Sequence, residues 1–477
     1  MSNRIIGREG EIAQLDHIMK SNRAELVAVY GRRRVGKTFL IKEYFEGKFD
    51  FYATGIYEGK KSNQLAIFHD ELQRHIGTPI KRPSSWMEAF MALRDYLDGL
   101  QQDRVVVFLD ELPWFDYPKG QFLKAFEWFW NSWGSTCDKL KLIVCGSATT
   151  WMTDTFIGGK GGLYNRTTER IYLAPFNLYE TEQLLRSKDI DWDRMTILEA
   201  YMTFGGVPLY LSMLRNNLSP YGNVDSLFFA DHAPLRSEYE FLFQSLFKSS
   251  DYYTDIINAI ASKNIGITRS QIVEKAKVTN NGTLTKALNN LISCDFIRSY
   301  NAWGKSRRDT MYQLTDLSIL FYKRFVEGYN NKDEHFWTNT IDSPARRAWT
   351  GIAFEQVCLI HLPQIKQALG IAGVLTEACS WRFAGDDNYP GCQIDLLIAR
   401  HDKVINLCEM KFSQDEYSIT PAYSKDLLQR RSTFRNTTHT GNSLHLTMIT
   451  PRGLHRNANS SIINSVVTLD SLFEPKR

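Results

Sequence analysis

Short apolar runs alternate with amphipathic stretches through the first 180 residues of the chain. Helical stretches such as 86–100 and 121–133 fill the gaps between these runs. The runs that have the length and composition of buried strands are 25–30, 50–56, 105–109, 140–145 and 170–174. Because strands alternate with helices here, the pattern predicts an α/β domain with a mostly parallel sheet.

The pattern changes beyond residue 178. A helical stretch runs to about 250 and is broken at Gly205–Pro208, and a small separate unit and a helical connector follow it. A long helix is predicted after Pro344, and strands are predicted near 374–383, 393–399, 404–411 and 444–449. These changes predict four domains: a core at 1–180, a helical lid at 181–250, a middle unit with its connector at 251–345, and a carboxy-terminal domain at 346–477.

The bulk composition is that of an ordinary globular protein. The 477 residues are 43% hydrophobic and 23% charged, and the formal net charge is +4. Such a small charge does not require nucleic acid as a partner, although a local basic patch remains open. The seven cysteines never have C-x-x-C spacing, the start is not a signal peptide, and no apolar run approaches the roughly 18–20 residues that span a bilayer. We therefore expect a soluble, cytoplasmic protein with no membrane association.

The segment Gly31–Thr38 has the spacing G-x-x-x-x-G-K-[ST] of a phosphate-binding loop. It follows the apolar run 26–30 and precedes a helix-like stretch, which is the context that this motif needs. Glycines let backbone amides curl around a phosphate, and the start of the helix adds a positive dipole end. Lys37 is expected at the β- and γ-phosphates and Thr38 at Mg²⁺. The predicted nucleotide contacts in this loop are Gly31, Val35, Gly36, Lys37 and Thr38.

An acidic pair follows the apolar run 105–109. The carboxyl ends of such strands are where open α/β sheets bind ligands. Asp110 is predicted to hold Mg²⁺ through water, and Glu111 is predicted to orient the attacking water as a catalytic residue. After the next strand, Ser147 is predicted to sense the γ-phosphate; an ordinary cap of a strand-to-helix turn is the alternative.

On these motifs the amino-terminal half resembles the archaeal-type ATPase family, within the AAA+ and signal-transduction ATPase lineage. Other segments that carry the resemblance are Ile6–Glu9, Leu163–Arg166, Leu173–Phe176 and Gly205–Tyr210. The resemblance implies a P-loop NTPase sheet with a helical lid and ATP as the nucleotide. Gly7 and Arg8 would lie near the adenine, and Pro208 would lie by the nucleotide in the lid. Arg166 or Arg170 would reach a γ-phosphate in trans, or would be an ordinary surface arginine.

The middle unit resembles a winged helix. Residues 267–276 and 283–292 suggest two helices joined by a turn, and 296–300 with 311–314 suggest a hairpin after them. In the functional interpretation the second helix enters a major groove of DNA, and Lys305, Arg307 and Arg308 contact phosphates. The alternative is a packing or oligomerisation module.

Three charged residues interrupt an apolar hairpin near the carboxyl end. Asp395 lies in the strand 393–399, and Glu409 and Lys411 share one face of the returning strand 404–411. Charges in such a hairpin are costly unless they are paired or functional. The arrangement D-x(13)-E-x-K resembles the PD-(D/E)xK nuclease superfamily, which implies an α/β restriction-endonuclease-like domain. This chain departs from that pattern because Ile394 stands where the family has proline.

The resemblance implies a nuclease site with Mg²⁺. Asp395, Glu409 and the helical Glu355 would hold the metal, and Lys411 would position the attacking water or stabilise the transition state. On this interpretation Asp395, Glu409 and Lys411 are catalytic. Residues that could touch phosphate from a downstream helix, 423–430, are Tyr423, Lys425 and Gln429. A surface hairpin with an ion pair is the alternative.

Three functional hypotheses remain open from the sequence. In the first, ATP state controls a DNA-binding, Mg²⁺-dependent nuclease. In the second, the protein is an ATP-dependent switch or DNA-binding regulator whose carboxy-terminal domain does not cleave. In the third, it is a signalling ATPase that binds protein and has no nucleic-acid role. The expected ligands are ATP and Mg²⁺, DNA is the expected macromolecular partner, and a homo-oligomer is left open.

Overall fold

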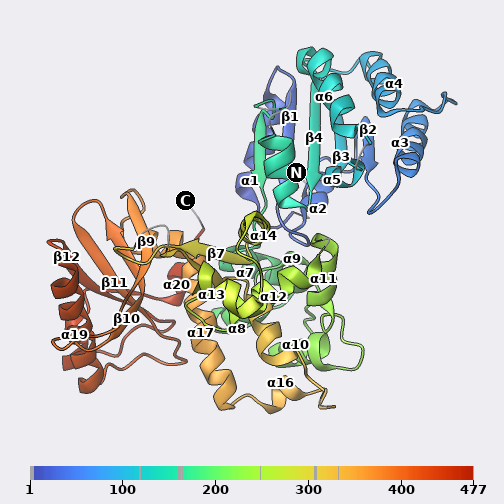
Figure 1. The fold of residues 1–477 in the computed structure, drawn as a ribbon. Coiled ribbons are helices and arrows are strands. Elements are labelled where there is room, and N and C mark those ends of the chain that lie inside the picture. The colour runs from blue at the N-terminus through green and yellow to red at the C-terminus, as the bar shows by residue number, and fades with distance from the viewer. Residues whose placement is uncertain are drawn as a thin grey trace. The chain divides into compact units, whose positions relative to one another are not determined.

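The computed structural model describes residues 5–117, 120–159, 163, 165–247, 249–305, 309–330 and 332–475. The chain forms two compact units, Met1–Pro175 and Phe176–Arg477 (Figure 1). Two residues predicted to contact DNA phosphates, Arg307 and Arg308, lie outside the described residues.

A five-stranded parallel sheet forms the centre of the first unit, with the strand order β2-β3-β4-β1-β5. The strands are β1 (Glu25–Tyr30), β2 (Phe51–Thr54), β3 (Val105–Asp110), β4 (Leu140–Gly146) and β5 (Glu169–Tyr172). Strands β3 and β4 are buried along their whole length, as expected when helices cover both faces of a parallel sheet. The predicted α/β class with a parallel sheet is confirmed.

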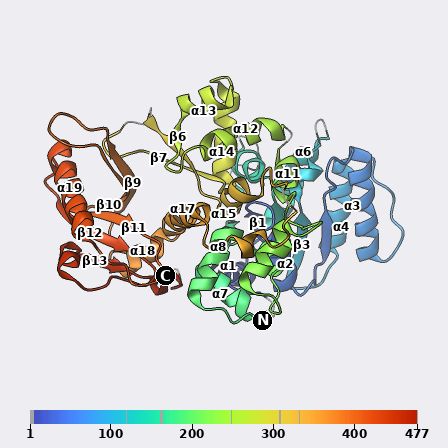
Figure 2. The ribbon, with the colours of Figure 1, turned by 90° about the horizontal axis from the view of Figure 1, so that it is seen from below.

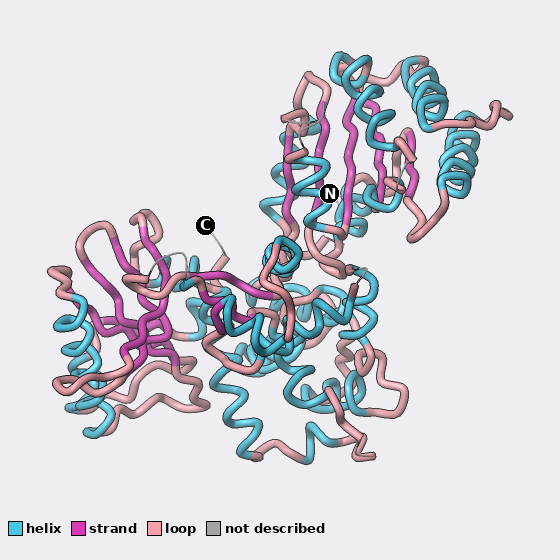
Figure 3. The backbone as a smooth tube through the Cα atoms, viewed as in Figure 1, coloured by secondary structure: helices cyan, strands magenta, loops and turns pink. Residues whose placement is uncertain are grey.

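Helices cover both faces of this sheet (Figure 3). On one face lie α1 (Glu9–Lys20) and α2 (Lys37–Tyr44), and on the other lie α3 (Lys61–Ile76), α4 (Trp86–Asp98) and α6 (Phe122–Ser132). Shorter elements of this unit are α5 (Leu112–Phe115), the 3-10 turn Gly134–Thr136 and the π-helical turn Trp151–Ile157. The two layers leave the carboxyl ends of the strands free to carry the predicted nucleotide site.

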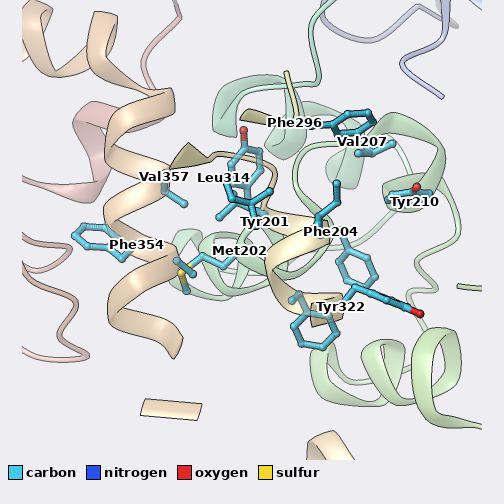
Figure 4. Close-up of a cluster of buried hydrophobic side chains, with 14 of the residues drawn as sticks. Tyr201, Met202, Phe204, Val207, Tyr210, Phe296, Leu314, Tyr322, Phe354 and Val357 are labelled. Carbon is cyan, nitrogen blue, oxygen red and sulfur yellow. The ribbon is translucent and has the colours of Figure 1, made fainter. Parts of the chain in front are cut away.

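The second unit begins with helices. They are α7 (Leu178–Arg186), α8 (Arg194–Phe204), α9 (Pro208–Ser212), α10 (Pro220–Val224), α11 (Glu238–Leu246) and α12 (Ser250–Ala261), with the π-helical turn Asp225–Phe229. Later helical segments are α15 (Leu317–Phe321), the π-helical turn Tyr322–Val326 and α16 (Phe336–Asn339). Figure 4 shows Tyr201 and Met202 of α8 in one buried cluster with Val357, which belongs to a helix of the carboxy-terminal part.

A small helix–turn–helix segment with a hairpin lies within the second unit. It contains β6 (Ile267–Thr268), α13 (Arg269–Ala276), α14 (Gly282–Ser293), β7 (Ile297–Tyr300) and β8 (Met311–Leu314). Antiparallel pairing gives the strand order β6-β8-β7. Thr268 and Gln271 form a capping box at α13, and Asn281 caps α14, so local side chains fix the start of both helices.

A second five-stranded sheet forms the carboxy-terminal part (Figure 2). Its strands are β9 (Thr376–Phe383), β10 (Cys392–Arg400), β11 (Val404–Met410), β12 (Ser443–Ile449) and β13 (Ser465–Val467). The order is β13-β12-β11-β10-β9, and the pairs are antiparallel from β9 to β11 and parallel from β11 to β13.

Helices also cover both faces of this sheet. On one face lie α17 (Pro344–Ile360), α18 (Leu362–Ala368) and α20 (Leu469–Leu472), and α19 (Pro421–Thr438) lies on the other, where the 3-10 turn Ala458–Ile462 packs beside it. Within the described segments, no helix combines the length and the apolar character needed to cross a membrane.

Candidate functional site

The loop between β1 and α2 needs glycine at its first position. Gly31 has a φ of 146°, and a Cβ atom built there would lie 2.3 Å from the carbonyl oxygen of Leu173. Gly36 takes a φ of 90° at the start of α2, where a left-handed backbone favours glycine. The side chain of Val35 is buried between them. The glycine spacing therefore reflects the path that the backbone takes around the loop.

Lys37 and Thr38 begin helix α2. The Lys37 ammonium is buried and donates hydrogen bonds of 2.8 Å to the carbonyl oxygens of Gly31 and Arg32. It lies inside the loop, at the positive end of the helix dipole. The chemistry of this cradle, a buried cation at a helix start, fits a phosphate group.

Asp110 lies at the end of β3 and joins the two nucleotide motifs. Its carboxylate accepts 3.0 Å hydrogen bonds from the Thr38 hydroxyl, and one of its oxygens also accepts a 2.6 Å bond from the Cys145 thiol. Only 4% of the Asp110 surface is exposed. Burial, together with the charges of Asp110 and Glu111, raises the pKa of the Cys145 thiol, so Cys145 is a neutral donor. A hydroxyl beside a carboxylate fits the ligands that Mg²⁺ prefers.

Glu111 and Ser147 contact each other across the ends of β3 and β4. The Ser147 hydroxyl donates to one Glu111 carboxylate oxygen, and the Ser147 amide donates a 3.0 Å bond to the other. Glu111 has a left-handed backbone, with a φ of 49°. A non-glycine residue in this region is uncommon and costs conformational energy, which is typical of functional sites. The structure therefore joins Ser147 to the acidic pair by hydrogen bonds, and the γ-phosphate role of Ser147 stays a prediction.

Arg8 points into the first unit. It has a φ of 65° after Gly7 at 64°, and its guanidinium donates to the carbonyl oxygens of Val35 at 3.1 Å and Ala174 at 2.8 Å. The side chain is 5% exposed. Arg8 therefore ties the phosphate-binding loop to the segment after β5.

The remaining predicted nucleotide contacts are dispersed. Arg166 and Arg170 are exposed on the first unit, and Arg170 donates to the Thr167 hydroxyl at 3.2 Å. Pro208 begins α9 in the second unit. Roles for these three residues stay predictions.

A second group of charged residues lies at the hairpin β10–β11. Asp395 lies where the pairing of β9 and β10 shifts register, between Ile394 and Leu397. Such irregularities re-aim side chains. The Gln393 amide donates a hydrogen bond to the Asp395 carboxylate. Leu396 of β10 pairs with Cys408 of the antiparallel strand β11. Asp395 and Glu409 are the next residues on these two strands, one step beyond this pair.

Glu409 is nearly buried, with a 7% exposed surface. It accepts hydrogen bonds from the Tyr423 hydroxyl at 2.9 Å and from Arg430 at 3.0 Å, and the Lys411 ammonium lies 3.9 Å away. Burial raises the pKa of Glu409, although Arg430 and Lys411 oppose the shift. Both Tyr423 and Arg430 belong to α19, so this helix supplies the partners of the carboxylate.

Glu355 joins the group from α17. Burial, together with the charges of Asp395 and Glu409, raises its pKa to about 7, and the charge of Lys411 opposes the shift. Charge interactions thus link Glu355, Asp395, Glu409 and Lys411 in one electrostatic cluster, and the catalytic roles of these residues stay predictions.

The predicted metal ligands do not form a ready-made cage. Among the described residues, no group of three or more His, Cys, Asp and Glu side chains has a geometry that could hold a metal ion. The Mg²⁺ roles of Glu355, Asp395 and Glu409 therefore stay predictions. The cluster does have suitable chemistry, since neighbouring carboxylates, of which Glu409 is buried, favour a cation or a proton.

Sequence reasoning missed Arg430, Gln393 and Cys145. Arg430 follows Tyr423 by seven residues, which places both on one face of a helix, so this spacing was an available signal. Gln393 and Cys145 donate hydrogen bonds to Asp395 and Asp110, and no local sequence pattern predicts these contacts.

A model of the family described as "ATPase domain predominantly from Archaea" matches residues 5–214. The amino-terminal part of the chain is an ATPase domain of the archaeal type. The match includes the phosphate-binding loop, the Asp110–Glu111 pair and Ser147, and it extends into the second unit through α9.

Two proteins of Methanocaldococcus jannaschii are similar in sequence. "Uncharacterized protein MJECL04" is 26% identical over 330 residues, which cover 67% of this chain and 68% of that protein. "Uncharacterized ATP-binding protein MJ0423" is 46% identical over 43 residues, which cover 9% of this chain and 73% of that protein.

Solved structures with some likeness include the Walker-type ATPase PABY2304 of Pyrococcus abyssi and the ORC2 protein of Aeropyrum pernix. The first has a TM-score of 0.48 at 21% identity and covers 68% of this chain and 98% of its own. The second has a TM-score of 0.43 at 16% identity and covers 68% and 96%. Both TM-scores are below 0.5, so these structures add no evidence on function beyond the ATPase family match.

Proposed function

We propose that the ATPase domain binds and hydrolyses ATP with Mg²⁺, and that its nucleotide state controls a DNA-binding, Mg²⁺-dependent nuclease-like carboxy-terminal domain. The observation that carries the second half of this proposal is the cluster of Glu355, Asp395, Glu409 and Lys411, which three separate elements contribute. The ATPase family match and a relative named as ATP-binding support ATP as the nucleotide.

In the ATPase site, each residue has a distinct task. Lys37 leaves the carbonyl oxygens of Gly31 and Arg32 to bind phosphate oxygens, and Thr38 and Asp110 hold the metal directly or through water. The metal neutralises charge on the phosphates. Glu111 orients the attacking water, and Ser147 holds the Glu111 carboxylate in position until nucleotide binds.

In the carboxy-terminal site, Asp395, Glu409 and Glu355 would hold Mg²⁺, which acidifies a water and neutralises charge on the scissile phosphate. Lys411 would position that water or stabilise the transition state. The Glu355 pKa of about 7 applies to the metal-free site, so binding of Mg²⁺ at this carboxyl near neutral pH would displace a proton.

The helix–turn–helix segment with its hairpin would supply DNA binding as a winged helix. Its second helix, α14, leaves Thr283, Lys286 and Asn289 exposed, and Lys305 follows β7 in the hairpin. We assign phosphate contacts to Lys305 and groove contacts to α14.

The test is plasmid cleavage by the purified full chain with Mg²⁺ and ATP. We expect nicking by the wild type and loss of nicking in Asp395→Asn. The matched control is Asp402→Asn, because Asp402 lies in the turn of the same hairpin and pairs only with the nearby Arg400 among the described residues. Absence of nicking by the wild type, or equal nicking by Asp395→Asn, would sink the nuclease proposal.

A second candidate is an ATP-dependent DNA-binding regulator that does not cleave. The observation in its favour is that Tyr423 and Arg430 already bind the Glu409 carboxylate. Salt-sensitive DNA binding, with the DNA intact after long incubation in Mg²⁺, would support this candidate over the nuclease.

A further inference from the structure

The hairpin β7–β8 is joined to the edge of the carboxy-terminal sheet. The Trp303 amide donates a 2.7 Å hydrogen bond to the Ser380 carbonyl oxygen of β9. The Trp303 ring lies 5.9 Å from the ring of Phe434 in α19, within the core of that sheet. The small three-stranded sheet and the carboxy-terminal sheet therefore meet within the second unit.

A cavity of about 240 Å³ lies at this junction. Tyr300, Met311 and Ile265 give it apolar walls, and Gln271 and Gln393 add amide groups. Two exposed cations, Lys263 and Arg382, also line it. None of the described residues that line it is an Asp or Glu, so the charge at its rim is positive.

The cavity adjoins the acidic cluster. Gln393 lines the cavity and donates a hydrogen bond to Asp395, two residues along β10. On the hairpin side, Tyr300 donates a 2.6 Å bond to the Ile265 carbonyl oxygen, which fixes the ring at the wall. Burial raises the pKa of Tyr300; Ser380 and Arg298 oppose the shift, and the charge of Asp395 adds to it.

We propose that this cavity holds the base of one unpaired nucleotide of a DNA strand, next to the phosphate that the acidic cluster engages. Lys263 and Arg382 contact the phosphates that flank this base, and Tyr300 contacts the base itself. This inference rests on the proposed nuclease function and names its substrate class, which is single-stranded or locally unpaired DNA.

Size and chemistry support an unpaired base. The volume lies below the roughly 300–1,000 Å³ of pockets for drug-sized ligands, so the cavity accepts part of a nucleotide and leaves the phosphates at the rim. A base within a duplex is stacked and paired, and entering a pocket would require its extrusion. An aromatic wall beside two cations is the combination that single-strand binding sites use.

The test is the binding of a fluorescein-labelled thymidine oligonucleotide, and of a labelled duplex of equal length, to the full chain in EDTA. Fluorescence anisotropy over a range of salt concentrations gives both affinity and salt dependence. We expect the wild type to bind the single strand at least about tenfold more tightly than the duplex. This preference would reflect stacking of a base that the duplex cannot present.

Two variants separate the phosphate contacts from the base contact. Lys263→Glu with Arg382→Glu should make the negative slope of log affinity against log salt shallower by about 1.4, because each single-strand phosphate contact contributes about −0.7. Tyr300→Leu should weaken single-strand binding by about tenfold and leave the slope unchanged, whereas Tyr300→Phe should bind like the wild type. The matched control is Arg215→Glu with Arg324→Glu, two exposed arginines that do not line the cavity.

The outcomes separate this inference from the function on which it rests. A wild type that binds neither DNA at low salt contradicts both. A wild type that binds and nicks DNA overturns only this inference if it binds duplex equally well, or if the Lys263→Glu/Arg382→Glu slope equals that of the control pair. Thermal unfolding of each variant identifies any that has lost its fold.

Discussion

The two acidic sites of this protein have opposite electrostatic designs. At the end of β3, Asp110 accepts hydrogen bonds from a hydroxyl, a thiol and a backbone amide, and Glu111 is held by Ser147. At the β10–β11 hairpin, carboxylates crowd one another, and burial raises the pKa of both Glu355 and Glu409. Neutral donors satisfy the first site, whereas the second combines crowded carboxylates with the cations Arg430 and Lys411.

Because of this difference, we expect substitutions to affect different properties at the two sites. Removal of one donor at the ATPase site should change chemistry more than stability, because neighbouring donors remain. At the hairpin site, a change in charge should alter stability, pH dependence and the response to Mg²⁺.

The largest effect is expected for Lys37→Ala. This change removes the buried ammonium inside the phosphate-binding loop, and we expect ATP hydrolysis to fall on the order of 10²–10³-fold, as for other lost charge-stabilising donors. Measurement of phosphate release at saturating ATP tests it. The control is Lys42→Ala on the same helix, whose ammonium lies 4.4 Å from the centre of the Tyr52 ring. Equal activity of both variants would contradict the assignment of Lys37.

Glu355→Gln should stabilise the protein at alkaline pH. The pKa of Glu355 is about 7 in the folded state and 4.5 ordinarily. Below pH 4.5 the group is protonated in both states and has no effect. As pH rises from 4.5 to 7, the unfolded state ionises first, so the folded state loses about 3 kcal/mol of stability by pH 8. The neutral Gln avoids this loss.

Thermal unfolding at pH 4.5 and pH 8 measures this effect. We expect Glu355→Gln to raise the unfolding temperature at pH 8 and to leave it nearly unchanged at pH 4.5. The control is Glu377→Gln, an exposed glutamate of β9. If the variant is no more stable than the wild type at pH 8, the pKa of Glu355 is not raised in the folded protein.

Arg430→Gln should lower stability by about 1–2 kcal/mol. It removes the cation that donates to the nearly buried Glu409 carboxylate at 3.0 Å, and an unpaired buried charge is costly; partial exposure of Arg430 reduces the effect. We expect added Mg²⁺ to restore part of the loss, because a divalent cation can replace the missing charge. Thermal unfolding with Mg²⁺ and with EDTA tests this.

Arg431→Gln, at the adjacent and partly exposed position, is the control for Arg430. If Mg²⁺ fails to stabilise Arg430→Gln more than this control, the hairpin cluster does not bind Mg²⁺ in the free protein.

The smallest effect is expected for Ser147→Ala. This change removes one of two hydrogen bonds that Ser147 gives to Glu111, and the backbone amide keeps the other. A single hydrogen bond contributes about 0.5–1.5 kcal/mol, so ATP hydrolysis should change by about 3–10-fold. The control is Thr149→Ala, whose hydroxyl has no hydrogen-bond partner among the described residues. An unchanged turnover in Ser147→Ala would mean that the amide alone positions Glu111.

Local patterns predicted the strands accurately. The predicted runs 25–30 and 140–145 correspond to β1 (Glu25–Tyr30) and β4 (Leu140–Gly146), and the hairpin strands near 393–399 and 404–411 correspond to β10 and β11. Such strands are continuous apolar segments, so their period and length are properties of the sequence alone. The short strands β6 and β13 were missed because two or three residues carry too little pattern.

The sequence alone indicated the phosphate-binding loop, the Asp110–Glu111 pair and the placement of Asp395 and Glu409 on partner strands, because adjacent residues and strand alternation fix these features. Only the tertiary structure decided that Ser147 holds Glu111, that Arg8 turns inward, and that Arg430 contacts Glu409. Hydrogen bonds and charge interactions depend on distance in space, and residues far apart in the chain reach that distance only after the sheets and helices pack.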